Sequence, residues 1–163
     1  MKKISVIMVL NLLIGVFTLN AAYDMDKIEK DLTRLRAYEA WSKNAQDTSK
    51  GLSKDQIQLI AKIQKEVKEV KLSLLSDLEQ TKGSSGEARS PEGMRSSEME
   101  FLDIQRIVNL LKDEGDQKDL IKAEQSDPIF KGLISKPFQN LGTISRDIKD
   151  LQSEIKQEFR KAE

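Results

Sequence analysis

Four stretches of the chain repeat apolar residues at steps of three and four, the spacing that places them on one face of an α-helix. These stretches cover residues 24–42, 54–80, 98–114 and 138–161. No stretch alternates apolar and polar residues over the length of a strand. The pattern therefore predicts an all-α fold without a β-sheet.

Two of the predicted helices have a start signal in the sequence. Ser53 with Gln56, and Ser97 with Glu100, have the spacing of a capping box, in which two side chains bind each other's backbone amide at a helix start. Between the second and third helices, residues 81–96 contain glycine, serine and proline but no branched aliphatic residue. Such a segment buries too little apolar surface to offset the entropy of ordering, so we expect a flexible loop.

The second and fourth stretches carry the longest apolar stripes, and their steps are close to a coiled-coil heptad. The predicted seam residues are Ile60, Ile63, Val67, Val70, Leu74, Ile144, Ile148, Leu151 and Ile155. A short and a long predicted helix precede the loop, and a second short and long pair follows it. This order predicts an elongated antiparallel helical bundle of two hairpins. Apolar stripes usually form the core of their own bundle. Stripes of three or four heptads do not, however, distinguish packing within one chain from packing between chains.

The first 22 residues have the layout of a bacterial secretory signal peptide. Two lysines precede the apolar run Ile4–Leu19, and the small residues Ala21 and Ala22 follow it. This layout predicts export to the periplasm, the cell surface or the medium, with residues 23–163 as a single helical domain. The alternative is an uncleaved membrane anchor with the same topology, although the run is slightly short of the ~20 residues that span a bilayer. We expect membrane contact only through this segment.

The composition removes most catalytic chemistry. The chain has no cysteine and no histidine, which excludes disulfides, thiol nucleophiles and histidine bases, and leaves structural zinc without its usual ligands. Carboxylates such as Asp147 and Asp150 resemble an ordinary helix surface rather than a calcium loop. The 27 basic and 27 acidic residues are interleaved, which argues against binding to nucleic acid. We therefore predict a protein that is not an enzyme and needs no cofactor or metal.

Four aromatic residues stand out as candidate contacts for a protein partner. Tyr38 and Trp41 lie near the end of the first helix, and Phe130 and Phe138 flank a proline-containing connection. Aromatic residues often dominate the binding energy of an interface. The alternative for each is a place in the chain's own core.

These features favour an exported interaction protein that acts through helix–helix contacts, as an adaptor, an assembly factor or a host-factor binder. The alternative is a self-assembling structural component, in which the apolar seams pair copies of one chain. A periplasmic chaperone of the cell envelope lies between the two and would need an exposed apolar surface.

Overall fold

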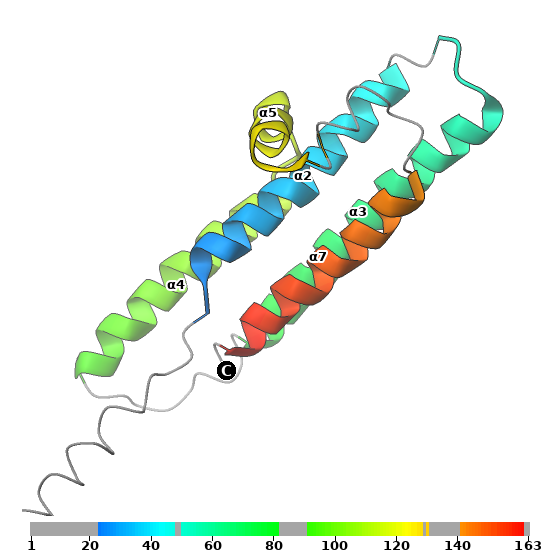
Figure 1. Ribbon diagram of the computed structural model, residues 1–163. Coiled ribbons are helices and arrows are strands. Elements are labelled where there is room, and N and C mark those ends of the chain that lie inside the picture. Colours follow the sequence, from blue (N-terminus) through cyan, green and yellow to red (C-terminus); the bar gives the residue numbers. More distant parts are fainter. Residues whose placement is uncertain (1–22, 48–49, 82–90, 129, 131–140, 162–163) are drawn as a thin grey trace, which may run out of the picture.

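The computed structural model describes residues 23–47, 50–81, 91–128, 130 and 141–161. The described residues form the helices α2 (Met25–Asp47), α3 (Lys54–Thr81), α4 (Pro91–Lys112), α5 (Gln117–Ser126) and α7 (Leu141–Lys161) (Figure 1). These ranges contain no strand, which confirms the all-α prediction. The predicted signal segment, residues 1–22, lies outside the described residues.

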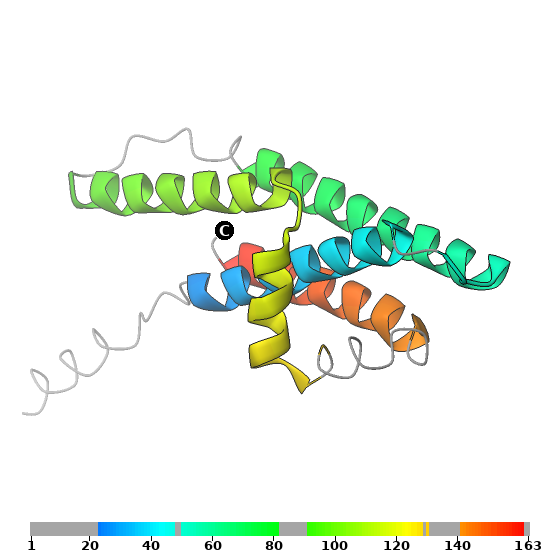
Figure 2. The same ribbon diagram turned by 90° about the horizontal axis from the view of Figure 1, so that it is seen from above.

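Helix α2 is the one described helix that contacts all the others. It packs against α3, α4, α5 and α7. Helix α3 runs antiparallel to α2, as the first predicted hairpin requires, and α7 lies beside α3 in the same direction as α3 (Figure 1). The short helix α5 crosses over α2, between the end of α4 and the last helix (Figure 2).

The second predicted hairpin is not formed in the described part of the chain. Helices α4 and α7 do not contact each other there, and both pack on α2 and α3 instead. The physical reason is α5, which crosses α2 and returns the chain to the other side of the bundle (Figure 2). The apolar pattern predicted the helices but not the crossing of α5 over α2.

Side-chain contacts mark the start of α3 and the end of α2. The predicted capping box at the start of α3 is present, because Gln56 N donates to Ser53 Oγ at 3.2 Å and Ser53 N donates to Gln56 Oε1 at 2.8 Å. Helix α2 continues five residues beyond the predicted end, to Asp47. Side chains in this added turn bind other helices, since Asn44 Nδ2 donates to Gln117 Oε1 at 3.0 Å.

The helices α4 and α5 differ from the prediction. Helix α4 begins at Pro91, so residues 91–96 are helical, and the capping box predicted at Ser97 is wrong because this serine lies inside the helix. Proline suits a first helical position, where its missing N–H breaks no hydrogen bond. The apolar residues Leu120 and Ile121 predict one further turn over residues 117–124, whereas α5 has 10 residues and starts at a capping box formed by Asp116 and Asp119.

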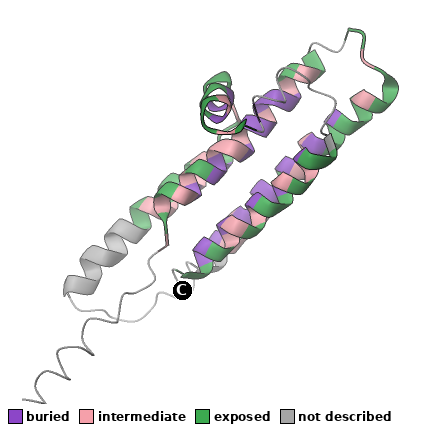
Figure 3. Ribbon diagram, viewed as in Figure 1, coloured by how far each residue is buried: buried purple, intermediate pink, exposed green. Residues whose placement is uncertain are grey.

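Most of the apolar core lies between α2, α3 and α7 (Figure 3), and α4 and α5 add Ile107, Leu111, Leu120 and Ala123. All nine predicted seam residues belong to it, and none is more than 6% exposed. In this structure their side chains pack within one chain, where α3 and α7 lie along each other. Ile57, one turn before the seam, is 45% exposed instead.

We expect the core and surface leucines of α3 to differ in their effect on stability. Leu74 is 0% exposed and Leu59 is 40% exposed. Replacing Leu74 by alanine should lower the free energy of unfolding by about 2–5 kcal/mol, because the substitution leaves a cavity. The matched control, Leu59→Ala, should cost less than about 1 kcal/mol. Urea unfolding followed by circular dichroism measures both, and equal costs would contradict the burial pattern.

Candidate functional site

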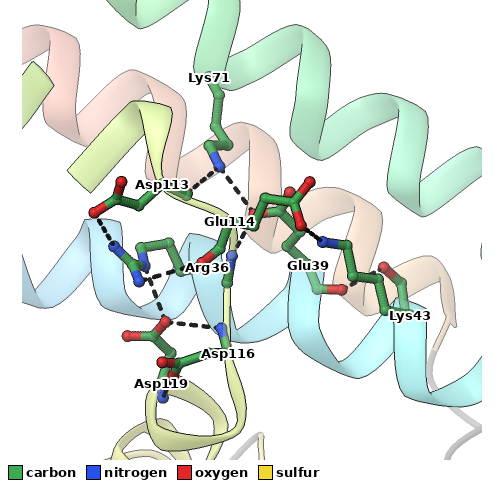
Figure 4. Close-up of polar contacts among 10 residues, drawn as sticks. Arg36, Glu39, Lys43, Lys71, Asp113, Glu114, Asp116 and Asp119 are labelled. Carbon is green, nitrogen blue, oxygen red and sulfur yellow. Dashed lines mark hydrogen bonds and ion pairs between the residues drawn. The ribbon is translucent and has the colours of Figure 1, made fainter. Parts of the chain in front are cut away.

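A group of charged residues surrounds the connection between α4 and α5, where residues 113–116 pass over α2 (Figure 4). We call it the α2 charge cluster. Its members are Arg36, Glu39, Lys43, Lys71, Asp113, Glu114, Asp116 and Asp119. They come from α2, α3, the connection and α5, so the cluster joins four parts of the chain.

Lys71, which is buried, and Glu39, which is half-buried, form the centre of this cluster. Lys71 is 8% exposed, and its Nζ lies 2.9 Å from Glu39 Oε2. The same Nζ donates to the Asp113 carbonyl oxygen at 2.8 Å, and Glu39 Oε2 also accepts from the Gly115 amide at 2.8 Å. A buried charge is tolerated when it is paired and hydrogen-bonded in this way. These contacts fix the connection on α2 and α3.

Arg36 attaches the start of α5 to α2. Its Nε donates to Asp119 Oδ2 at 2.9 Å, and its Nη2 donates to the Glu114 carbonyl oxygen at 3.3 Å. Asp119 Oδ2 also accepts from the Asp116 amide at 3.0 Å. The Asp119 side chain of the α5 capping box therefore binds α2 as well, which couples the start of α5 to its packing on α2.

Gly115 allows the connection to approach the backbone of α2. A Cβ atom added at Gly115 would overlap the carbonyl oxygen of Arg36. No larger residue fits without a shift of the backbone, because the obstacle is backbone rather than a flexible side chain.

A second polar group joins α2 to α7. Arg34 Nη2 donates to both carboxylate oxygens of Asp147, at 2.8 and 2.9 Å, and Arg34 Nε lies 2.9 Å from Asp127 Oδ2. Burial disfavours the Arg34 charge, but Asp147 and Asp127 outweigh it and hold the pKa of Arg34 above its ordinary value. Asp147 is thus an interhelical partner rather than the surface residue that the sequence suggested, whereas Asp150 is exposed.

The phenol of Tyr38 completes this group. Its hydroxyl donates to Asp147 Oδ2 at 2.5 Å. Burial raises the pKa of Tyr38 far above its ordinary value, and the hydrogen bond to Asp147 raises it further. The phenol therefore stays neutral and gives the site a hydrogen-bond donor, not a base or a nucleophile.

A third polar group joins the start of α2 to the last turns of α7. Glu158 is 2% exposed. Its carboxylate accepts from Lys161 Nζ at 2.7 Å, from the Asp24 amide at 3.1 Å and from Lys27 Nζ at 3.4 Å. The hydrogen bond from Lys161, with help from the Asp24 amide, lowers the pKa of Glu158 against the effect of burial. This carboxylate lies at the start of α2, where the helix dipole favours negative charge.

Three of the four aromatic residues proposed as partner contacts lie in the core. Tyr38 and Phe130 are 0% exposed and Trp41 is 5% exposed. The rings of Tyr38 and Phe130 pack together, with centroids 4.6 Å apart. A partner could reach these rings only if the helices separated. Phe138 lies outside the described residues.

The exposed apolar residues of α4 form a different candidate contact. Phe101 is 53% exposed and Leu102 is 65% exposed, and we call this pair the α4 apolar face. Helix α4 also extends beyond the start of α2 (Figure 1). The sequence signal for this face is the width of the apolar stripe. Its members in the third stretch are Phe101, Leu102, Ile104, Ile107, Val108, Leu110 and Leu111.

The described residues offer little else in the way of a ligand site. A shallow pocket of about 150 Å³ lies at the turn between α2 and α3 and is lined by Leu52, Ile57 and Ile60 among others. This volume is below the ~300 Å³ of a typical small-molecule site. No group of acidic side chains among the described residues could hold a metal ion. None of the helices in the described ranges is long and apolar enough to cross a membrane.

Two glycines give a matched test of the close approach at the connection. Gly115→Ala should lower the free energy of unfolding by about 1–3 kcal/mol, because the new methyl group forces the backbones apart. A Cβ at Gly142, in α7, would meet nothing within 4 Å. Gly142→Ala should therefore stabilise the helix by about 0.5–1 kcal/mol. Chemical unfolding of both variants measures the difference, and the same sign for both would refute the role of Gly115.

The contact between Tyr38 and Asp147 should appear in the pH dependence of stability. Tyr38→Phe removes one buried hydrogen bond to a charged group and should cost about 1.5–3 kcal/mol at neutral pH. The folded state holds the Tyr38 proton more tightly than the unfolded state does, so this contribution is present below about pH 10 and is lost as the pH rises further. The stabilities of wild type and Tyr38→Phe should thus converge in alkaline solution, and a constant difference would contradict the assignment.

Comparison of the chain with protein-family models, curated proteins and solved structures gives no match.

Proposed function

We propose that this protein is an exported helical interaction protein, and that its α4 apolar face binds an amphipathic helix of another protein. In this role it would act as an adaptor, an assembly factor or a host-factor binder. The observation that carries the proposal is the exposure of Phe101 and Leu102 on a helix whose other side packs on α2 and α3.

The surroundings of this face resemble those of a protein contact site. Gln105, Arg106 and Asn109 are exposed on the next turns of α4, so polar residues border the two apolar ones. An apolar centre with a polar border is the usual arrangement of an interface. An exposed ridge on a helix is complementary to the apolar stripe of a second helix, which is why we expect a helical partner.

The packing of α4 would help such binding. Arg106 Nε lies 2.7 Å from Glu29 Oε1, and Tyr23 donates to Asp103 Oδ2 at 2.8 Å. These contacts hold α4 on α2, so the face needs little ordering when a partner arrives. The half-buried charges Arg34, Arg36 and Glu39 of α2 each pair with a residue on another helix, which supports a structural role for them.

Export is the part of this proposal that depends on the sequence alone. The lysines, the apolar run and the small residues of positions 1–22 support passage out of the cytoplasm. We therefore place the partner in the periplasm, on the cell surface or outside the cell.

A photo-cross-linking amino acid at position 105, beside the α4 apolar face, tests the proposal in the native cell envelope. We expect one cross-linked partner in fixed ratio, with the cross-link in an amphipathic helix. The variant Phe101→Ser with Leu102→Ser should reduce its recovery about tenfold, as loss of a binding anchor worth ~1.4 kcal/mol or more implies.

The matched control is Leu72→Ser, because Leu72 is 56% exposed but lies on α3. This variant should recover the partner as well as the wild type does. Equal loss in both variants would contradict a specific role of α4. Recovery of only this protein, at a multiple of its monomer mass, would instead support the self-assembling alternative.

A further inference from the structure

Asp31 is a buried carboxylate on α2 that lacks a complete set of partners. Asp31 is 4% exposed, and its Oδ2 atom has no hydrogen-bond partner among the described residues. A buried ionised carboxylate normally requires a paired cation or several donors. Asp31 lies one turn from Lys27 and Arg34, which both bind α7. It is therefore a buried carboxylate on this side of α2 whose charge is incompletely compensated.

The cations nearest to Asp31 along α2 are already used by other carboxylates. Lys27 Nζ lies 3.5 Å from Glu154 and 3.4 Å from Glu158. Arg34, one turn on the other side of Asp31, is paired with Asp127 and Asp147. Lys30, the remaining lysine near Asp31, is exposed.

Glu154 of α7 carries a negative charge that acts on Asp31. Burial raises the pKa of Asp31 to about 6, and the negative charge of Glu154 raises it further, while Arg34, Lys27 and Lys30 oppose the shift. Ionised Asp31 is thus a buried negative charge that Glu154 repels, while the Glu154 side chain is itself 45% exposed and lies 3.5 Å from Lys27 Nζ. Protonated Asp31 removes this repulsion and becomes a hydrogen-bond donor.

We propose that Asp31 is a proton-operated latch between α2 and α7, which is closed in mildly acidic solution and loosened near neutral pH. The direction follows from linkage. The folded state binds the Asp31 proton more tightly than the unfolded state, so the stabilisation is fully present below about pH 4 and is lost as the pH rises to about 6. The latch is independent of the proposed partner binding by α4.

Hydrogen exchange of the whole protein, read by mass spectrometry at about pH 5 and about pH 7.5 and corrected for the intrinsic rates, tests this latch. In the wild type we expect the protection of α7 amides to fall about tenfold between the two conditions, because pH 5 lies about one unit below the Asp31 pKa of about 6. Amides of α5, which does not contact α7 in the described residues, should change much less.

Two variants and one control separate the latch from other titrations. In Asp31→Asn, the protection of α7 should no longer depend on pH. In Glu154→Gln, the loss of protection should move to lower pH, because the repelling charge is gone. The control Asp150→Asn changes an exposed carboxylate of α7 and should keep the wild-type response.

Two results would overturn the latch. One is an unchanged pH response in Asp31→Asn. The other is an equal loss of protection in α5 and α7 of the wild type, which would indicate global unfolding rather than loosening of one interface. If Asp31→Asn does not fold, Glu154→Gln decides, since an unshifted response in that variant is also incompatible with the latch.

Discussion

The partial burial of charged residues on α2 is the constraint on which the rest of this structure depends. Arg34, Arg36 and Glu39 lie on a helix that is covered on several sides. None of them can be buried without a partner of opposite charge or a backbone group to bind. Those partners come from α3, the α4–α5 connection, α5 and α7, so α2 is stable in its place only when the other elements are in theirs.

This constraint accounts for the arrangement of the helices. Glu158 binds the start of α2, Asp147 binds its middle, and the α2 charge cluster surrounds its second half. Polar contacts at three positions along α2 fix its register against α7 and the α4–α5 connection. Apolar stripes alone specify this register less sharply. The α3–α7 pair then needs only its apolar seam and a few polar contacts, such as that of Ser145 with Glu66 at 2.6 Å.

The sequence predicted the parts of the fold that depend on local spacing. The apolar stripes of α3 and α7 match the helical period, and the capping box of Ser53 and Gln56 marks the start of α3. Both helices could therefore be predicted from the sequence. The capping box of α5 was not recognised because it has aspartate at the third position, where the usual pattern has Glu or Gln. The start of α4 was missed because Ser90, Pro91 and Gly93 give this segment the composition of a loop.

The candidate site could be predicted only in part, because its residues are brought together by tertiary contacts. Asp31, Arg36 and Asp147 resemble surface charges of an amphipathic helix until their partners are known. The aromatic rings of Tyr38 and Phe130 fit both a core and an interface, and the structure places them in the core. The exposed Phe101 and Leu102 were assigned to the stripe of their helix, since a sequence does not show how much of a wide stripe its neighbours cover.

The most direct test of the account is to remove α2. A fragment of residues 50–163 lacks this helix, and its thermal unfolding can be followed by circular dichroism. The account predicts no cooperative transition, because α3, α4, α5 and α7 lose the element against which all of them pack, and it predicts that a peptide of residues 23–47 added in trans restores the transition. A cooperative transition of the fragment alone would contradict the central role of α2.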